Sequence, residues 1–446
     1  MPIPPYASWM LEQEARALLS RLGRVRPFAM QETMLPAAGL LPSSQVAIET
    51  YLMRGRRELR RMVKHFLRFL RVTGSRTDAA TAQRRFSILR LRFVGVLTQF
   101  DLFNDVMTQR SESETGIWLS GLDVVSADAL RLRQPVFDMP PIICYLDRGV
   151  GAAIRRARTR LPGGGDNPAA IIKVPRERMI GSGIASSLIH EVGHQAAALL
   201  GLVDSLRRVL RQKRREAHAD AEAWRYWDRW ISEIVADFWS VARVGVGSTM
   251  GLMGVVSLPR VFVFRITLTD PHPAPWIRVK VSAAIGQALY PQPAWAKLTG
   301  IWESYYPPVR LTDYQEHVFG MLERTLPEFV ALLINHRPPA LGGRSLKEAL
   351  DTEEMQPARL TALLARWRVA PWEMYLERPI VVFAAIGQGR ADGTITPEEE
   401  STVLAKTLTH WALKSTLEAA ADCAAKPVRP CGCGGTVDGN RRISTS

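Results

Sequence analysis

The alternation of apolar and polar residues predicts a mostly helical chain with a few short strands near its middle. Residues 1–115 carry a helical pattern that the polar segment at 110–116 interrupts, and the pattern is helical again from Tyr305 onward. Two short apolar runs, at residues 141–146 and 169–174, are typical of strands. We therefore expect an α+β fold that is mostly helical and contains a small sheet.

Four further segments in the middle of the chain complete this prediction. Residues 149–161 have helical spacing and lead into a Gly- and Pro-rich turn at 162–168. Residues 260–268, RVFVFRITL, are typical of another strand. Residues 184–200 predict one long helix, and a second long helix should begin near Glu216.

Charge adds a possible partner to this picture. The chain has 58 Lys and Arg against 43 Asp and Glu, and its net charge of +15 favours acidic partners. Many of these charges lie in residues 53–71, between apolar residues at helical spacing: Leu59, Val63, Phe66, Leu67 and Leu70. Such a helix could bind an anionic surface. We favour a core-packed helix with a solvated basic face, because apolar stripes usually pack inward.

The sequence predicts neither an integral membrane span nor a secretory signal. The most apolar stretch, residues 244–258, is short, holds four glycines and stops at Pro259, so we expect a buried helix or a pair of strands. The N-terminus lacks a basic start followed by an apolar run. Three of the four cysteines lie in the last 24 residues, so reduced thiols and a cytoplasmic location are the default expectation.

The candidate chemistry lies in IHEVGHQAA, residues 189–197. Residues four apart in an α-helix share one face, so His190 and His194 can reach one metal ion. Glu191 would lie beside the metal without being a ligand, where its carboxylate can take a proton from water. A pattern with three fixed positions also arises by chance, so the surrounding sequence must support it.

A catalytic zinc site usually has three protein ligands, so a further ligand must come from elsewhere in the chain. In WISEIVADFWS, Glu233 and Asp237 are also four residues apart. Glu233 can be the third ligand, and Asp237 can hold a ligand histidine through its other ring nitrogen. His218 and Glu222 are rival third ligands, and His218 has no partner placed as Asp237 is.

A third segment, DPHPAPWIRV, contains His272 and Arg278. His272 could stabilise the oxyanion of a tetrahedral intermediate, and Arg278 could bind a carboxylate or brace the site. The alternative is a loop histidine with a surface arginine.

Together the three segments resemble one family of gluzincin metallopeptidases, the CAAX-prenyl-endopeptidase and heat-shock membrane protease family. HExxH at 190–194, ExxAD at 233–237 and HPxxxxRV at 272–279 follow the family's order, within roughly residues 170–285. The resemblance implies Zn²⁺ ligands at His190, His194 and Glu233, a general base at Glu191, and supporting roles for His272, Asp237 and Arg278. The family's membrane enzymes have spanning helices that this chain lacks, so it is closer to soluble relatives, and membrane substrates cannot be carried over.

The strand at 169–174 fits this resemblance. In zinc peptidases of this kind, an edge strand just before the active-site helix can pair with an extended peptide. The alternative is an interior strand without a free edge.

These observations divide the chain into four regions. We expect a basic helical region at 1–115, a zincin-like metallopeptidase domain with a small sheet over its active-site helix at 116–345, a helical region at 346–425 and a flexible tail at 426–446. The CGCGG stretch within the tail does not make a closed four-ligand metal site.

Residues 388–400, QGRADGTITPEEE, partly resemble a calcium-binding EF-hand loop that ends at Glu399. Gln388 and Arg390 occupy the first and third ligand positions, where a neutral amide and a cation are poor substitutes for carboxylates. We therefore favour a helix–loop–helix turn capped by Thr396.

The sequence thus predicts a zinc-dependent metalloendopeptidase in which Glu191 activates a zinc-bound water to cleave a peptide or protein substrate. An alternative is a basic helical binding protein whose zincin core is a scaffold that docks on nucleic acid or an anionic membrane. The intact set of metal-binding residues argues against that alternative.

Overall fold

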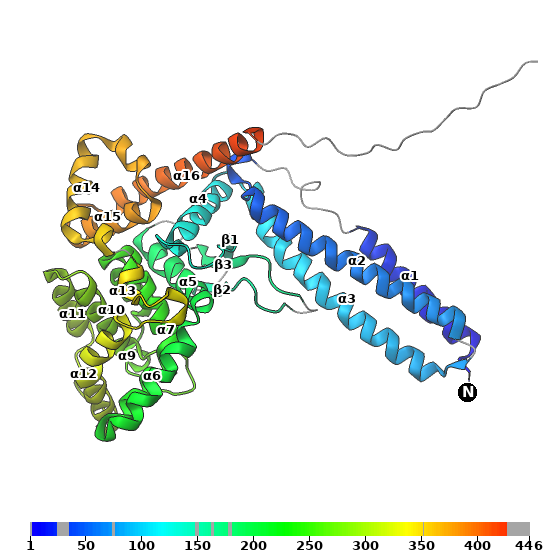
Figure 1. Ribbon diagram of the computed structural model, residues 1–446, viewed down its shortest axis with the longest axis horizontal. Helices are drawn as coiled ribbons and strands as arrows, with labels where there is room; N and C mark the ends of the chain where they lie inside the picture. The colour runs from blue at the N-terminus through cyan, green and yellow to red at the C-terminus, as the bar shows by residue number, and fades with distance from the viewer. Residues whose placement is uncertain are drawn as a thin grey trace, which may run out of the picture.

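The computed structural model consists of a helical body, a long helical arm and a small sheet between them (Figure 1). It describes residues 2–24, 35–73, 76–147, 151–161, 165–176, 181–350 and 352–425. The structure confirms the predicted α+β fold class, because it is mostly helical and contains a small sheet. The tail at 426–446, with Cys431 and Cys433, lies outside the described residues.

The arm is formed by α1 (Pro5–Arg24), α2 (Pro42–Thr73) and α3 (Ala79–Thr108), which pack along one another. Asp78 caps α3 by accepting a hydrogen bond from the backbone N–H of Thr81 at 2.9 Å. The apolar stripe of α2 is buried in a core that belongs to the arm: Leu59, Val63, Phe66, Leu67 and Leu70. The favoured interpretation of this basic helix, with a packed stripe and a solvated basic face, is therefore confirmed.

The sheet contains three strands in the order β1-β3-β2 within the described residues: β1 (Ile142–Asp147), β2 (Ala153–Arg155) and β3 (Ala170–Pro175). β1 runs parallel to β3, and β2 runs antiparallel to it. Alternate residues point to opposite faces of a sheet, and here each face meets a different core. Paired Ile143 and Ile171 join the core of the arm, whereas paired Cys144 and Ile172 join the core of the body. The sheet therefore connects the arm to the body.

Two predictions about strands are confirmed and one about their arrangement is wrong. Both apolar runs form strands, β1 and β3. The expected edge strand at 169–174 is instead the middle strand, because β1 and β2 flank it on either side. Its nearly continuous burial agrees with an interior position, since an interior strand packs on both faces.

Two other local predictions are wrong. The described part of the run at 149–161, residues 151–161, does not form a helix: Ala153–Arg155 pair with β3, and Arg158 then turns the chain with a φ of 62°. Residues 260–268 form no strand: Arg260–Val263 are the short helix α9, and irregular chain follows. The short helix begins directly after Pro259, whose carbonyl accepts hydrogen bonds from the N–H groups of Phe262 and Val263.

The body is a set of helices packed on one continuous core that runs from Leu119 to Trp411. Its helices are α4 (Ser113–Leu130), α5 (Ser182–Leu200), α6 (Leu202–Glu216), α7 (Ala221–Val244), α8 (Val246–Val256), α9 (Arg260–Val263), α10 (Pro275–Leu289), α11 (Pro293–Tyr305), α12 (Asp313–Ile334), α13 (Leu346–Ala349), α14 (Pro357–Val369), α15 (Pro379–Ala391) and α16 (Pro397–Ala425). The helices after residue 346 thus share the core of the preceding region.

Helix α5 matches the prediction for 184–200 and ends at Gly201, whose φ of 61° is the left-handed conformation that commonly stops a helix. The second long helix, α7, begins at Ala221 and is almost wholly buried over its second half. The glycine-rich stretch at 244–258 is a buried helix, α8, as expected. In the described part of the chain, no helix has both the length and the apolar character needed to cross a membrane.

The turn between α15 and α16 is the capped turn that the sequence favoured. Thr396 accepts a hydrogen bond from the N–H of Glu399, whose side chain accepts one from the N–H of Thr396 in return. Asp392 accepts a hydrogen bond from Gln388, and Arg390 pairs with Glu400. The oxygens of Asp392 and Glu399 that resemble calcium ligands therefore make protein contacts.

Candidate metal centre

The site lies where α5 crosses α7, and a glycine allows the two helices to approach. A Cβ on Gly193 would lie 2.8 Å from the Cα of Ala236, a distance that real Cβ atoms do not tolerate. Small residues at a helix crossing permit close packing of the backbones. The close approach brings His190 and His194 on α5 opposite Glu233 on α7.

Three side chains form a compact donor set at this crossing. The Nε2 of His190 lies 3.3 Å from one carboxylate oxygen of Glu233, and the Nε2 of His194 lies 3.5 Å from the other. One donor atom from each of the three residues lies within 4.8 Å of the others. Ligand atoms about 2.0–2.2 Å from a tetrahedral zinc are about 3.3–3.6 Å apart. The two distances to Glu233 are close to this spacing, so the three side chains could hold a metal ion.

Asp237 and Arg278 hold His190 in position. Asp237 lies 2.8 Å from Nδ1 of His190, which leaves the Nε2 of that ring facing the donor set. Arg278, near the start of α10, donates two hydrogen bonds to the carboxylate of Asp237, at 2.7 and 2.9 Å. Only 11% of the Arg278 side chain is accessible, so it is not the surface arginine of the alternative interpretation.

The charges of these groups are mutually dependent. Burial opposes ionisation of Asp237, but Arg278 and then His190 outweigh it and lower the pKa of Asp237. Burial likewise opposes protonation of His190, yet the charge and hydrogen bond of Asp237 raise the pKa of His190 above its usual value. The pKa of Glu233 is lowered despite its burial, because His190 and His194 bond to its carboxylate.

Glu191 lies beside the donor set without belonging to it. Its side chain is buried, and this burial is the main cause that raises the pKa of Glu191, against the influence of His190 and His194. A carboxyl group whose pKa is raised toward neutrality is suited to accept and then return a proton.

His272 reaches the same carboxylate from the loop before α10. Its Nε2 lies 3.3 Å from Glu233, and its Nδ1 lies 2.8 Å from Asp270. The ring is half-exposed, with 50% of the side chain accessible, whereas His190 and His194 are 13% and 17% accessible. His272 therefore occupies the solvent side of the donor set.

Of the rival ligands, Glu222 pairs with Arg225 at 3.4 Å and is not part of the donor set. His218 lies in a short 3₁₀ turn, His218–Asp220, and its side chain is outside the described structure.

Several positioning residues escaped the sequence reasoning. Gly193 occupies a variable position of HExxH, and Asp270 comes two residues before His272. Ala236 is the fixed alanine of ExxAD, but the motif does not show that its backbone meets Gly193. Gln195, wholly buried on α5, accepts a hydrogen bond from the N–H of Ala157 at 2.8 Å and so ties the segment after β2 to the helix. Only the Asp-x-His spacing at 270–272 offered a signal, since a carboxylate so close can orient an imidazole.

Comparisons with known proteins identify no relative. No protein-family model matches the chain, and no curated protein and no solved structure matches it significantly.

Proposed function

We propose that the chain is a zinc-dependent metalloendopeptidase of the gluzincin type. The observation that carries the proposal is the donor set of His190, His194 and Glu233 with the buried Glu191 next to it. When bound, zinc would supply a Lewis acid that lowers the pKa of water and polarises a peptide carbonyl.

The side chains around this set have separate tasks in the proposed reaction. Glu191 takes a proton from the attacking water and passes it to the amine that leaves. His272, on the solvent side, donates a hydrogen bond to the oxyanion that develops on the peptide carbonyl. Asp237 and Arg278 keep the ring of His190 in one orientation throughout.

An extended substrate can bind at β2 rather than at β3. β2 is the outer strand on its side of the sheet and also contacts α5, which carries the two histidines. An outer strand can pair its backbone with an extended peptide. The position of β2 beside α5 and the order of the three motifs support a zincin-like core. They also support the resemblance to the CAAX-prenyl-endopeptidase and heat-shock membrane protease family.

Replacing Glu191 with glutamine tests the proposal. Gln keeps the size of the side chain but cannot act as a base, so Glu191→Gln should retain zinc while peptide hydrolysis falls by at least ~100-fold. The measurement is zinc content together with cleavage of a peptide library on which the wild-type protein is active.

Glu222→Gln is the matched control, because it makes the same change on α7 outside the donor set. It should keep both zinc and activity. Cleavage at the wild-type rate by Glu191→Gln would refute the proposed mechanism. Absence of bound zinc in the wild-type protein would refute the proposal that the chain is a zinc peptidase.

A second candidate function, a scaffold that docks on acidic surfaces, is favoured by one observation, the basic arm. A scaffold protein could bind as much zinc as an enzyme. In that case, however, the wild-type protein and Glu191→Gln would both fail to cleave any peptide of the library.

A further inference from the structure

The outer part of the arm concentrates the positive charge of the protein. Residues 54–92 contain thirteen Arg and Lys side chains, whereas Glu58 and Asp78 are their only acidic side chains. This gives a formal charge of +11 to a stretch of a chain whose total is +15. Such a density attracts a polyanionic partner, and the attraction is strongest at low salt.

Large apolar side chains are exposed among these charges. Val72 at the end of α2 and Ile88 and Leu91 on α3 are 72%, 54% and 73% exposed. Figure 1 shows that the chain starts at the far end of the arm, and there Tyr6 and Trp9 on α1 are exposed and stacked at 5.6 Å. Apolar and aromatic side chains are thus available to a partner together with the arginines.

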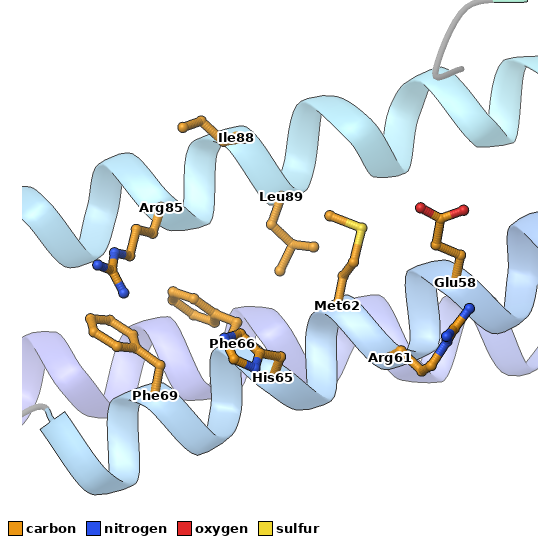
Figure 2. Close-up of a pocket in the computed structure, with 9 residues that line it drawn as sticks. All are labelled: Glu58, Arg61, Met62, His65, Phe66, Phe69, Arg85, Ile88 and Leu89. Atoms are coloured by element: carbon orange, nitrogen blue, oxygen red, sulfur yellow. The ribbon is translucent and has the colours of Figure 1, made fainter. Parts of the chain in front are cut away.

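A groove between α2 and α3 combines both properties (Figure 2). It has a volume of about 520 Å³, and Met62 and Leu89 point into it from the two helices. Cationic side chains flank the apolar floor, among them Arg61 and Arg85, and Arg85 lies over the ring of Phe69 at 4.2 Å. The guanidinium group of Arg85 thus makes a cation–π contact with this ring.

We propose that the outer part of the arm, residues 54–92 with the start of α1, docks on the surface of an anionic phospholipid bilayer. The arginines would contact lipid phosphates, and the exposed apolar side chains would enter the boundary between head groups and acyl chains. Tyr and Trp favour this same boundary. A nucleic acid would use the charges but not Val72, Ile88 or Leu91, because its outer surface consists of phosphates.

The proposal is independent of the metal centre. The arm has its own hydrophobic core, and in Figure 1 it leads away from the helices that carry the donor set. Loss of zinc or of peptide hydrolysis should therefore leave docking unchanged. In turn, a failure to bind vesicles would not affect the proposed peptidase.

The test measures binding of the full chain to vesicles by co-sedimentation. Vesicles of phosphatidylcholine with one third phosphatidylglycerol should bind the protein, vesicles of phosphatidylcholine alone should not, and binding should weaken as salt rises. The variant Arg61→Gln, Arg68→Gln and Arg84→Gln removes three exposed charges from the arm and should bind at least ~10-fold more weakly.

The matched control removes three exposed charges from α6 in the body, with Arg208→Gln, Arg214→Gln and Arg215→Gln, and should bind like the wild type. A second arm variant, Ile88→Ser with Leu91→Ser, keeps every charge and should also bind anionic vesicles more weakly, because both side chains are exposed.

Three results would overturn the proposal. The first is equal binding to neutral and anionic vesicles, and the second is an equal loss of binding in the arm and α6 charge variants. The third is tighter binding to duplex DNA or RNA than to anionic vesicles, with no effect of the serine variant on either.

Discussion

His190 and Glu233 of the donor set are held by neighbours that also shift their pKa values. Asp237 bonds to one nitrogen of His190, and Arg278 bonds to Asp237, so a chain of contacts runs from α10 through α7 to α5. Partners of this kind orient a ligand and raise its basicity. Glu233, although buried, has a lowered pKa for a different reason, because His190 and His194 bond to its carboxylate.

The identity of the ligands is the first prediction at this scale. His190→Ala, His194→Ala and Glu233→Ala should each lower zinc content strongly, because a site with two protein ligands holds zinc much less tightly. His218→Ala should retain the metal. Metal analysis of protein purified without chelator makes the comparison. Loss of zinc in His218→Ala together with retention in Glu233→Ala would reverse the assignment.

Zinc binding should also depend on pH. The contact with Asp237 raises the pKa of His190, so the metal-free ring carries a proton at neutral pH that zinc must displace. Affinity should therefore weaken as pH falls through the range in which His190 gains its proton. Titrations against a competing chelator from pH 6 to 9 measure this dependence.

Asp237→Asn supplies the control for this prediction. An amide no longer stabilises the imidazolium, so the pH dependence should become shallower, and the affinity at high pH should fall by ~10- to 100-fold. An affinity that is constant over the whole pH range in the wild-type protein would contradict the role given to Asp237.

At the scale of elements, the site depends on how closely α5 and α7 pack. Gly193→Ala would place a methyl group 2.8 Å from the backbone of Ala236, so the helices must separate. We expect a loss of about 1–3 kcal/mol in the free energy of unfolding. Zinc affinity should weaken as well, since the histidines move away from Glu233. Thermal unfolding and zinc titration measure the two effects.

Gly254→Ala is the control for the helix substitution itself. Gly254 is exposed on α8 and a Cβ there would contact nothing within 4 Å, so alanine should stabilise the protein by about 0.5–1 kcal/mol. If both glycine variants are equally stable, close packing at Gly193 does not determine the site.

Local sequence patterns predicted the long helices and the donor set better than they predicted the sheet. The four-residue spacings of His190 with His194 and of Glu233 with Asp237 define helix faces, and these faces meet. The short runs at 149–161 and 260–268 were misassigned, because a short apolar or basic run fits either a helix or a strand. The interior position of β3 depends on pairing with distant segments, which local spacing does not reveal.

For the whole molecule, the sheet makes the arm and the body mechanically dependent on each other. Paired Ile143 and Ile171 belong to the core of the arm, while their neighbours Cys144 and Ile172 belong to the core of the body. A substitution on one face of a strand shifts the strand's backbone, so it should also disturb the packing on the other face. The two cores should therefore unfold together.

Ile171→Ala tests this coupling. It removes buried apolar volume from the arm side of β3, so the free energy of unfolding should fall by about 2–5 kcal/mol. All tryptophans except Trp9 lie in the body, so their fluorescence reports the body, while far-UV circular dichroism reports the helices of both parts. If the two cores are coupled, the midpoints of both unfolding transitions should shift together to a lower denaturant concentration. Ile88→Ala is the control, and it should shift neither transition because the Ile88 side chain is exposed. A fluorescence transition that stays at its wild-type midpoint in Ile171→Ala, while the dichroism transition moves, would mean that the arm unfolds independently of the body.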